Sequence, residues 1–185
     1  AYIPDSAQVQ KAINEWARRR LDRGGAPITV RLVKGANLEM ERVDASLHGW
    51  PQAPFKSKRE TDANYHHMLL EAMHPENLRA VRVGIASHNL FDIAFGIELT
   101  RECNAWDCVQ FEMLEGMANH QRRALRERVE NLLLYAPACR KEEFLNAIGY
   151  LLRRLDENTG PENFLRHAFR LQVGSEDWSR LEGGF

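Results

Sequence analysis

The hydrophobic positions follow two different periods along the chain. Residues 6–22 carry apolar side chains at helical spacing, and the glycines and proline of "RGGAP" end that pattern. An apolar run rich in β-branched residues, "ITVRLVKGA", comes next. The pattern therefore predicts a helix over about residues 6–22 and a strand beginning near residue 28.

Three further strand patterns follow, and each has a helical pattern after it. The strands are predicted in "AVRVGIASHN", "CVQFEMLEGM" and "NLLLYAPA". The helical patterns cover roughly residues 60–76, 89–103, 117–129 and 141–157, with shorter ones near 39–48 and in "GPENFLRHAF". Strands that alternate with helices indicate βαβ units, hence a parallel sheet with helices on its outside.

Polar or small residues gather where the four predicted strands end. They are Lys34-Gly35-Ala36, Ser87-His88-Asn89, Glu115-Gly116 and Tyr135. In α/β folds the ligand lies at the carboxyl ends of the strands, so this repeated placement favours a binding site. The chain has no G-x-G-x-x-G or P-loop motif, which disfavours a Rossmann dinucleotide site. A barrel, a half-barrel and a flavodoxin-like sheet stay open.

Composition narrows the class of protein. The chain has 185 residues, a net charge of −1, 44% hydrophobic and 28% charged residues, as in a soluble globular domain. The near-neutral balance argues against nucleic-acid binding, and no apolar run is long enough to cross a bilayer. Three cysteines without paired spacing indicate a reducing, cytoplasmic setting. The adjacent His66 and His67 do not form a metal pair, so no metal site is predicted.

Arg31 is a charged residue inside an apolar strand pattern. Alternation places Thr29, Arg31 and Val33 on one face of the strand. A strand covered by helices is buried on both faces, so a charge there must be paired or must face a ligand. One interpretation is an internal salt bridge to Glu112 or Glu115, and the other is a role in a ligand site.

The helix predicted over residues 141–157 carries two separate stripes. One is apolar, and the other consists of Tyr150, Arg153, Arg154 and Glu157 at i, i+3, i+4 and i+7. Two adjacent guanidinium groups can hold one carboxylate through several charge-assisted hydrogen bonds. The helix begins beside the end of the last strand, so carboxylate binding stands as an alternative to a solvated helix face.

These segments resemble a known family. "YLLRRLDENT" resembles the Tyr-x-x-Arg-Arg-x-x-Glu motif of proline dehydrogenases, and "RLVKGA", "ASHN" and "FEMLEGM" resemble that family's later barrel strands in the same order. The stretch "RLVKGANLEMERVDASLHGWPQAP" is most similar to the proline dehydrogenase part of bifunctional proline catabolic enzymes. The resemblance runs from Ala1 to about Phe169. Where many members have aromatic residues, this chain has Asn37 and Leu38.

The resemblance implies a fold and an activity. The family fold is a distorted (βα)8 TIM-like barrel that binds FAD without a Rossmann motif. It oxidises L-proline to Δ1-pyrroline-5-carboxylate by hydride transfer to the flavin N5, and a membrane quinone receives the electrons. We therefore expect an α/β fold that forms the C-terminal part of such a barrel, with about four parallel strands and outer helices. The resemblance also implies a cytoplasmic protein that can lie at the inner face of the membrane.

The resemblance further implies roles for individual residues. The cofactor-binding set is Arg31 beside the flavin N5, Lys34, Gly35 and Ala36 in the adjoining loop, and Ser87 and His88 near the ribityl and pyrophosphate groups. The substrate-binding set is Arg153 and Arg154 on the proline carboxylate, Leu114 and Tyr135 at the pocket, and Tyr150 and Glu157 on the same helix. Arg31 and Tyr135 are the expected catalytic residues.

The two ends of the chain suggest a segment of a longer protein. The chain lacks an initial methionine, and residues 171–185 are polar. We expect residues 1–170 to form the C-terminal half of the proline dehydrogenase barrel and residues 171–185 to be a linker or tail. Half a barrel exposes two sheet edges. Its partners would then be the remainder of the parent chain or further copies of itself, and the alternative function is an inactive, self-associating half-barrel.

Overall fold

The computed structural model describes residues 1–35, 37–160 and 163–185, without the side chains of residues 156 and 157. Four parallel strands form one sheet in the order β1-β2-β3-β4. Their bounds are Ile28–Leu32 for β1, Val81–Ala86 for β2, Val109–Leu114 for β3 and Leu132–Tyr135 for β4. Because the order in space equals the order along the chain, each strand is followed by a crossover to its neighbour. The predicted α/β fold with about four parallel strands and outer helices is confirmed.

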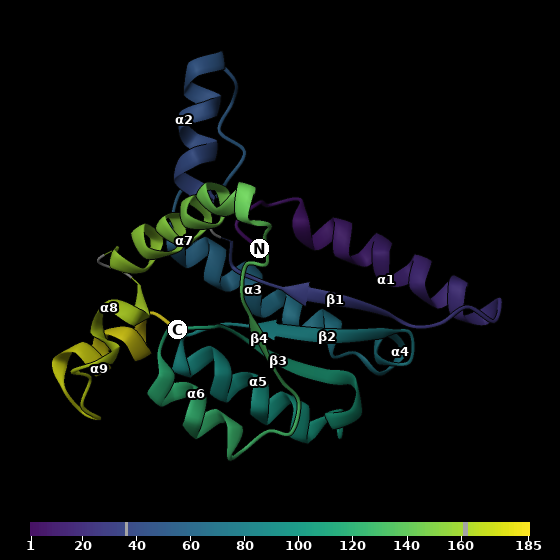
Figure 1. Cartoon of the computed structure of the whole chain (residues 1–185). Helices are drawn as coiled ribbons and strands as arrows, with labels where there is room; N and C mark the ends of the chain where they lie inside the picture. Colours follow the sequence, from purple (N-terminus) through teal and green to yellow (C-terminus); the bar gives the residue numbers. More distant parts are fainter. Residues whose placement is uncertain (36, 161–162) are drawn as a thin grey trace.

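The helices lie around this sheet (Figure 1). Their bounds are α1 Ser6–Asp22, α2 Leu38–His48, α3 Lys58–Ala72, α4 Pro75–Leu78, α5 Leu90–Glu102, α6 Asn119–Arg126, α7 Phe144–Thr159, α8 Phe164–Ala168 and α9 Glu176–Gly183, with 3-10 turns η1 Trp106–Cys108 and η2 Lys141–Glu143. Helix α2 projects away from the rest of the molecule, while α8 and α9 lie together at the opposite side from the end of α1.

The core lies between the sheet and the helices. In the central strands β2 and β3, Ile85 and Phe111 are buried and belong to the same apolar cluster as Tyr65 and Leu69 of α3. The opposite face of these strands carries Gly84 and Glu112. The sheet thus has one apolar face under the helices and one face with polar groups, as strand alternation requires.

One predicted helical stretch differs in detail from the structure, and the C-terminal segment contains a helix that the pattern did not predict. The stretch 60–76 is divided into α3 and the short α4, because Pro75 starts a new helix after an extended His74. In the C-terminal segment, residues 171–185 contain α9, whose N-cap Ser175 accepts a hydrogen bond from the Trp178 amide. The proposed division into a barrel segment and a tail stays a prediction. In the described part of the chain, no helix is long and apolar enough to cross a membrane.

Candidate active site

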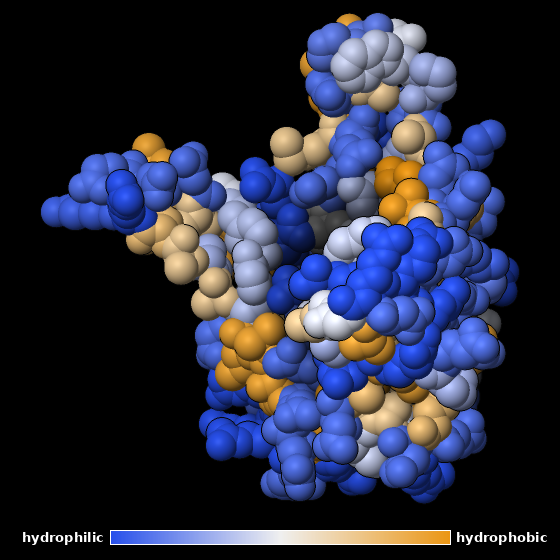
Figure 2. All heavy atoms as spheres, turned by 90° about the vertical axis from the view of Figure 1, so that its right-hand side faces the viewer, coloured by the Kyte–Doolittle hydropathy of each residue, from blue (hydrophilic) through white to orange (hydrophobic). Residues whose placement is uncertain are grey.

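A cavity of roughly 370 Å³ lies at the carboxyl ends of the four strands. Each strand contributes to it, and α7 closes one side. Its lining includes Arg31, Lys34 and Gly35 from β1 and the loop after it, Ser87 and His88 after β2, Leu114 at the end of β3, Tyr135 at the end of β4, and Tyr150 and Arg154 on α7. The surface is hollowed below the projecting helix α2 (Figure 2). The structure therefore brings together most of the residues singled out in the sequence.

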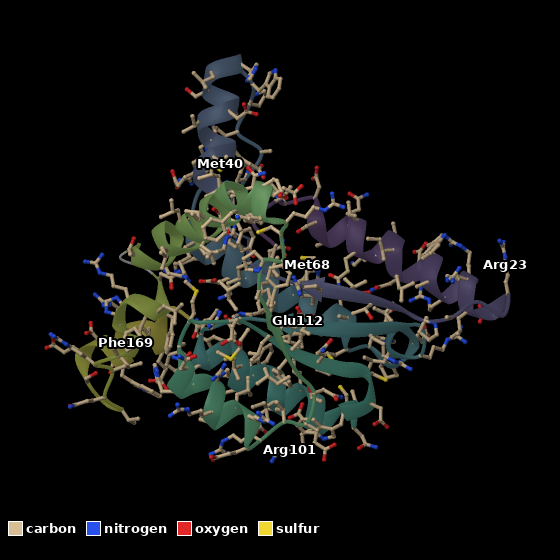
Figure 3. All side chains as sticks on the ribbon, in the orientation of Figure 1. Arg23, Met40, Met68, Arg101, Glu112 and Phe169 are labelled. Carbon is tan, nitrogen blue, oxygen red and sulfur yellow. The ribbon has the colours of Figure 1, made fainter. Side chains whose placement is uncertain are left out.

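Arg31 forms an ion pair with Glu112 across the polar face of the sheet. Glu112 is 5% exposed and lies in the middle of the molecule (Figure 3). Gly84 makes room for its carboxylate, because a Cβ at this position would fall closer than 3.0 Å to Glu112 Oε1. The internal salt bridge expected for Arg31 is thus formed with Glu112, while Glu115 pairs with Arg122 instead. Arg31 also lines the cavity, so its role in a ligand site stays a prediction beside the ion pair.

Two tyrosine rings connect Arg31 to the arginine of α7. The Arg31 guanidinium lies 4.9 Å from the centre of the Tyr135 ring. The Tyr135 and Tyr150 ring centres are 6.0 Å apart. Arg154 in turn lies 4.8 Å from the centre of the Tyr150 ring. Cation–π contacts of this kind hold guanidinium groups over an aromatic face, so both arginines have fixed positions at the cavity wall.

Arg153 and Arg154 face different places although they are adjacent. Arg154 lines the cavity and donates from Nη2 to Asn37 Oδ1 at 3.1 Å. Arg153 lines a separate depression against α2, beside Met40 and Val43. Successive residues on a helix point about 100° apart, which explains the divergence. A joint grip of the two arginines on one carboxylate stays a prediction. Glu157, the last residue of the motif, has its side chain outside the described part.

A network of charges surrounds Lys34. Its Nζ lies 2.6 Å from Asp62 Oδ1 and 2.8 Å from Asp92 Oδ2. Asp92 is fully buried and also accepts a hydrogen bond from Ser87 Oγ at 2.8 Å and contacts His66 Nε2 at 2.9 Å. Burial acts to raise the pKa of Asp92, but His66, Lys34 and Ser87 together hold that pKa below its usual value. The network thereby fixes both Lys34 and Ser87 at the cavity.

His88 is the group that best indicates a missing ligand. Its Nε2 accepts a hydrogen bond from the Leu114 amide at 3.0 Å, which places the ring proton of neutral His88 on Nδ1. Nδ1 is buried and has no hydrogen-bond partner among the described residues. Burial lowers the pKa of His88, so the neutral form is favoured. His88 lines the cavity, and its unpartnered Nδ1 proton could be satisfied by an acceptor on a ligand.

The remaining cavity residues fit an anionic cofactor. Four cationic and two acidic side chains line the cavity, so its charge favours a ligand with negative groups. Gly35 has a φ of +116°, and a Cβ there would fall closer than 3.0 Å to the Tyr2 ring. A side chain at position 35 would therefore collide with Tyr2. Ala36, the other predicted loop residue, lies outside the described residues.

Sequence reasoning missed the acidic partners of the site. Asp62 and Asp92 lie within predicted helices and gave no motif, and Gly84 looked like an ordinary strand residue. The signal that could have found them is the absence of any local partner for Lys34 on its own strand. Their positions next to Lys34 follow only from the packing of α3 and α5 on the sheet.

Parallel strands with outer helices, a cavity at the strand ends and no glycine-rich nucleotide loop define this protein as part of a barrel-type α/β ligand-binding domain. The proline dehydrogenase family matches residues 1–167. The chain therefore belongs to the proline dehydrogenase family.

Solved structures agree with this assignment. The chain is similar to a proline utilization A (PutA) of Corynebacterium freiburgense, with 43% identity and a TM-score of 0.82 over 99% of this chain. It is also similar to a PutA of Bdellovibrio bacteriovorus inactivated by N-propargylglycine, with 33% identity and a TM-score of 0.78 over 91% of this chain. The alignments cover 17% of each PutA chain. The comparison with curated proteins gave no match. The four-stranded fold thus corresponds to part of a larger barrel.

Proposed function

We propose that this segment forms part of an FAD-dependent enzyme that oxidises L-proline to Δ1-pyrroline-5-carboxylate. The observation that carries the proposal is the row of Arg31, Tyr135, Tyr150 and Arg154 along one cavity at the strand ends. Membership of the proline dehydrogenase family supports it. Because the chain spans 17% of the PutA chains that it matches, we assign the activity to a longer natural chain that contains these residues.

The substrate end of the site is the part between α7 and β4. L-Proline is a zwitterion, and its carboxylate needs a fixed positive charge to replace lost hydration. Arg154 lies at the cavity with its side chain held by Asn37 and Tyr150, so it is the first candidate for this contact. Arg153 is proposed as its companion, which requires its side chain to turn from the depression beside α2. Leu114 and Tyr135 supply walls for the pyrrolidine ring.

The cofactor end of the site lies nearer β1 and β2. Arg31, Lys34, Gly35, Ala36, Ser87 and His88 are the residues proposed to hold FAD. When bound, FAD supplies the two-electron acceptor for the oxidation, with a membrane quinone proposed as the later acceptor. His88 offers its unpartnered Nδ1 proton to an acceptor on the ligand. Arg31 keeps a positive charge at the cavity, and such a charge favours any negative charge that accumulates beside it.

The carboxylate contact is tested by Arg154→Ala in a natural chain that contains this segment. Loss of one charge-assisted hydrogen-bond partner costs roughly 1.5–3 kcal/mol, so the KM for L-proline should rise about ten- to a hundredfold. Arg153→Ala tests the companion role in the same assay. Arg126→Ala, an exposed arginine of α6, is the matched control and should leave KM unchanged. An unchanged KM in both α7 variants would reject the carboxylate role.

A second candidate function is favoured by the open sheet. β1 and β4 are the edges of the described sheet, and Leu133, Leu134 and Tyr135 of β4 are each more than a third exposed. These features suit an inactive half-barrel that associates with itself. The visible absorption spectrum of the 185-residue chain with and without added FAD separates the two. A yellow, flavin-loaded chain favours the enzyme, and a colourless one favours the structural role.

A further inference from the structure

A second cavity of roughly 390 Å³ adjoins the proposed cofactor site. Lys34, Lys58, Asn89 and Phe164 line both cavities, so the two spaces share one wall. The four shared residues make the second cavity the neighbour into which a long ligand of the first would extend. Arg154 and Tyr135 line the first cavity and not the second.

Helix α9 forms the outer wall of this second cavity. Its contribution is Arg180 and Leu181, followed by Gly184 and Phe185. The helix packs on α5 through aromatic contacts: Trp178 lies 5.0 Å and Phe185 lies 5.9 Å from Phe91, measured between ring centres. Aromatic pairs at these distances contribute packing beyond simple burial. The wall is thus held in place by residues from the segment that was expected to be only a linker or tail.

The charge of the second cavity suits a phosphate-bearing group. Lys34, Lys58, Arg59 and Arg180 face it, against the single carboxylate of Asp62 among its lining side chains. Asp62 is already paired with Lys34 and Lys58. Arg180 is held by Asp177 at 2.7 Å, on the same helix. Its guanidinium is therefore oriented before any ligand arrives, which lowers the entropy lost on binding.

We propose that α9 is the outer wall of the cofactor site and that Arg180 provides positive charge to the adenosine-diphosphate end of a bound flavin dinucleotide. The proposal rests on the proposed function, because it takes FAD as the ligand of the first cavity. It adds a residue and a helix to that site. The proposal also separates two flavins. FMN ends at its first phosphate, whereas FAD carries a second phosphate and an adenosine, so only FAD is expected to contact Arg180.

The test compares the two flavins on a natural chain that contains residues 1–185, by equilibrium titration of the apoprotein with fluorescence detection. Arg180→Gln should raise the Kd for FAD about three- to tenfold, as expected for an exposed charged contact, and leave the Kd for FMN unchanged. Trp178→Ala should act in the same direction by loosening α9. Arg170→Gln, which removes an exposed arginine shortly before α9, is the control and should change neither value.

Limited trypsin digestion gives a readout that does not depend on activity. FAD should slow cleavage after Arg180, and FMN should not. Equal loss of FAD and FMN affinity in Arg180→Gln, or no loss at all, would overturn the role of α9. A wild-type chain that binds neither flavin would reject the flavin enzyme itself, and the α9 proposal with it. These failures are distinguishable, because only the first leaves wild-type flavin binding intact.

Discussion

At the scale of single residues, the site depends on groups that are small or buried as much as on those that touch a ligand. Gly84 is an example, because its missing side chain leaves the space that the Glu112 carboxylate fills. Asp92 is another, because one buried carboxylate contacts Lys34, Ser87 and His66. Gly84 therefore acts through Glu112, and Asp92 acts through Lys34, Ser87 and His66.

Gly84→Ala should displace Glu112 and weaken its ion pair with Arg31. The added Cβ would fall closer than 3.0 Å to Glu112 Oε1, so the carboxylate must move. Overpacking of this kind typically costs about 1–3 kcal/mol, which should appear as a lower free energy of unfolding in urea. Gly183→Ala is the matched control, because nothing lies within 4 Å of its added Cβ. Equal stability of the two variants would contradict the space-filling role of Gly84.

The lowered pKa of Asp92 leads to an expected pH dependence of the free energy of unfolding. Its pKa is lower in the folded chain than the usual value of about 4, so its contribution is present above about pH 4 and is lost as the pH falls through the folded pKa. Asp92→Asn should lower the free energy of unfolding at pH 7 by on the order of 3 kcal/mol, because Lys34 loses a buried partner. Its stability should also vary less below pH 4.

Urea unfolding between pH 3 and pH 7 measures both effects. Asp107→Asn, an exposed aspartate of η1, is the control and should match the wild type across the range. If the free energy of unfolding of Asp92→Asn fell with decreasing pH as steeply as that of the wild type, titration of Asp92 would not be the cause of that fall.

At the scale of elements, α3 is the helix that carries charges to the cavity. Lys58, Asp62 and His66 recur at i, i+4 and i+8, so they lie on one face and meet Lys34 and Asp92. The helix begins at a capping box, in which Ser57 and Glu60 bond reciprocally to backbone amides. The cap fixes the first turn, and Lys58 lies in that turn.

Ser57→Ala should therefore loosen the start of α3. Loss of an N-cap side chain costs about 1 kcal/mol, which should lower the melting temperature by a few degrees. Because Lys58 lines both cavities, the variant should also bind FAD more weakly in a natural chain that contains this segment. Ser46→Ala, an exposed serine inside α2, serves as the control for removing a hydroxyl group. A melting temperature equal to that of the control would show that the cap contributes nothing.

At the scale of the whole molecule, the described sheet is open. The central strands β2 and β3 are largely buried. In β1, exposed residues alternate with less exposed ones, and β4 consists mainly of exposed residues. A closed barrel leaves no strand edge, but four strands cannot close. The exposed apolar side chains extend to α2 and α7, where Leu47 and Leu145 are about four-fifths exposed. The fold therefore carries apolar surface that further strands or further copies would cover.

The isolated 185-residue chain should for this reason not be a stable, fully active monomer. Each apolar side chain left uncovered forfeits roughly 1.5–3 kcal/mol, against a total stability of about 5–15 kcal/mol for a typical domain. Light scattering should detect association, and a proline-dependent dye-reduction assay should give little activity. A compact monomer that retains FAD and oxidises proline as fast as a longer natural chain would show that the expectation is wrong.

The sequence by itself determined the elements and the family. Hydrophobic periodicity located α1 and the four strands, because burial imposes periods of 3.6 and 2 on a helix and a strand. The ordered motifs from "RLVKGA" to "YLLRRLDENT" indicated the proline dehydrogenase family. The polar ends of β1, β2 and β4 line the cavity as expected, whereas Glu115 and Gly116 after β3 do not. These are local signals, carried by neighbouring residues.

Only the tertiary structure decided the contacts between distant segments. Lys34 meets Asp62 and Asp92 because α3 and α5 pack beside β1 and β2, and no local pattern encodes that approach. Arg153 and Arg154 are adjacent in the motif, yet the packing of α7 places Arg154 at the cavity and Arg153 at the depression beside α2. The polar C-terminal stretch likewise lines a cavity because Trp178 of α9 packs against Phe91 of α5, which are far apart in the sequence. Such long-range contacts depend on how the surfaces of whole helices and strands pack together, and the pattern of neighbouring residues does not specify that packing.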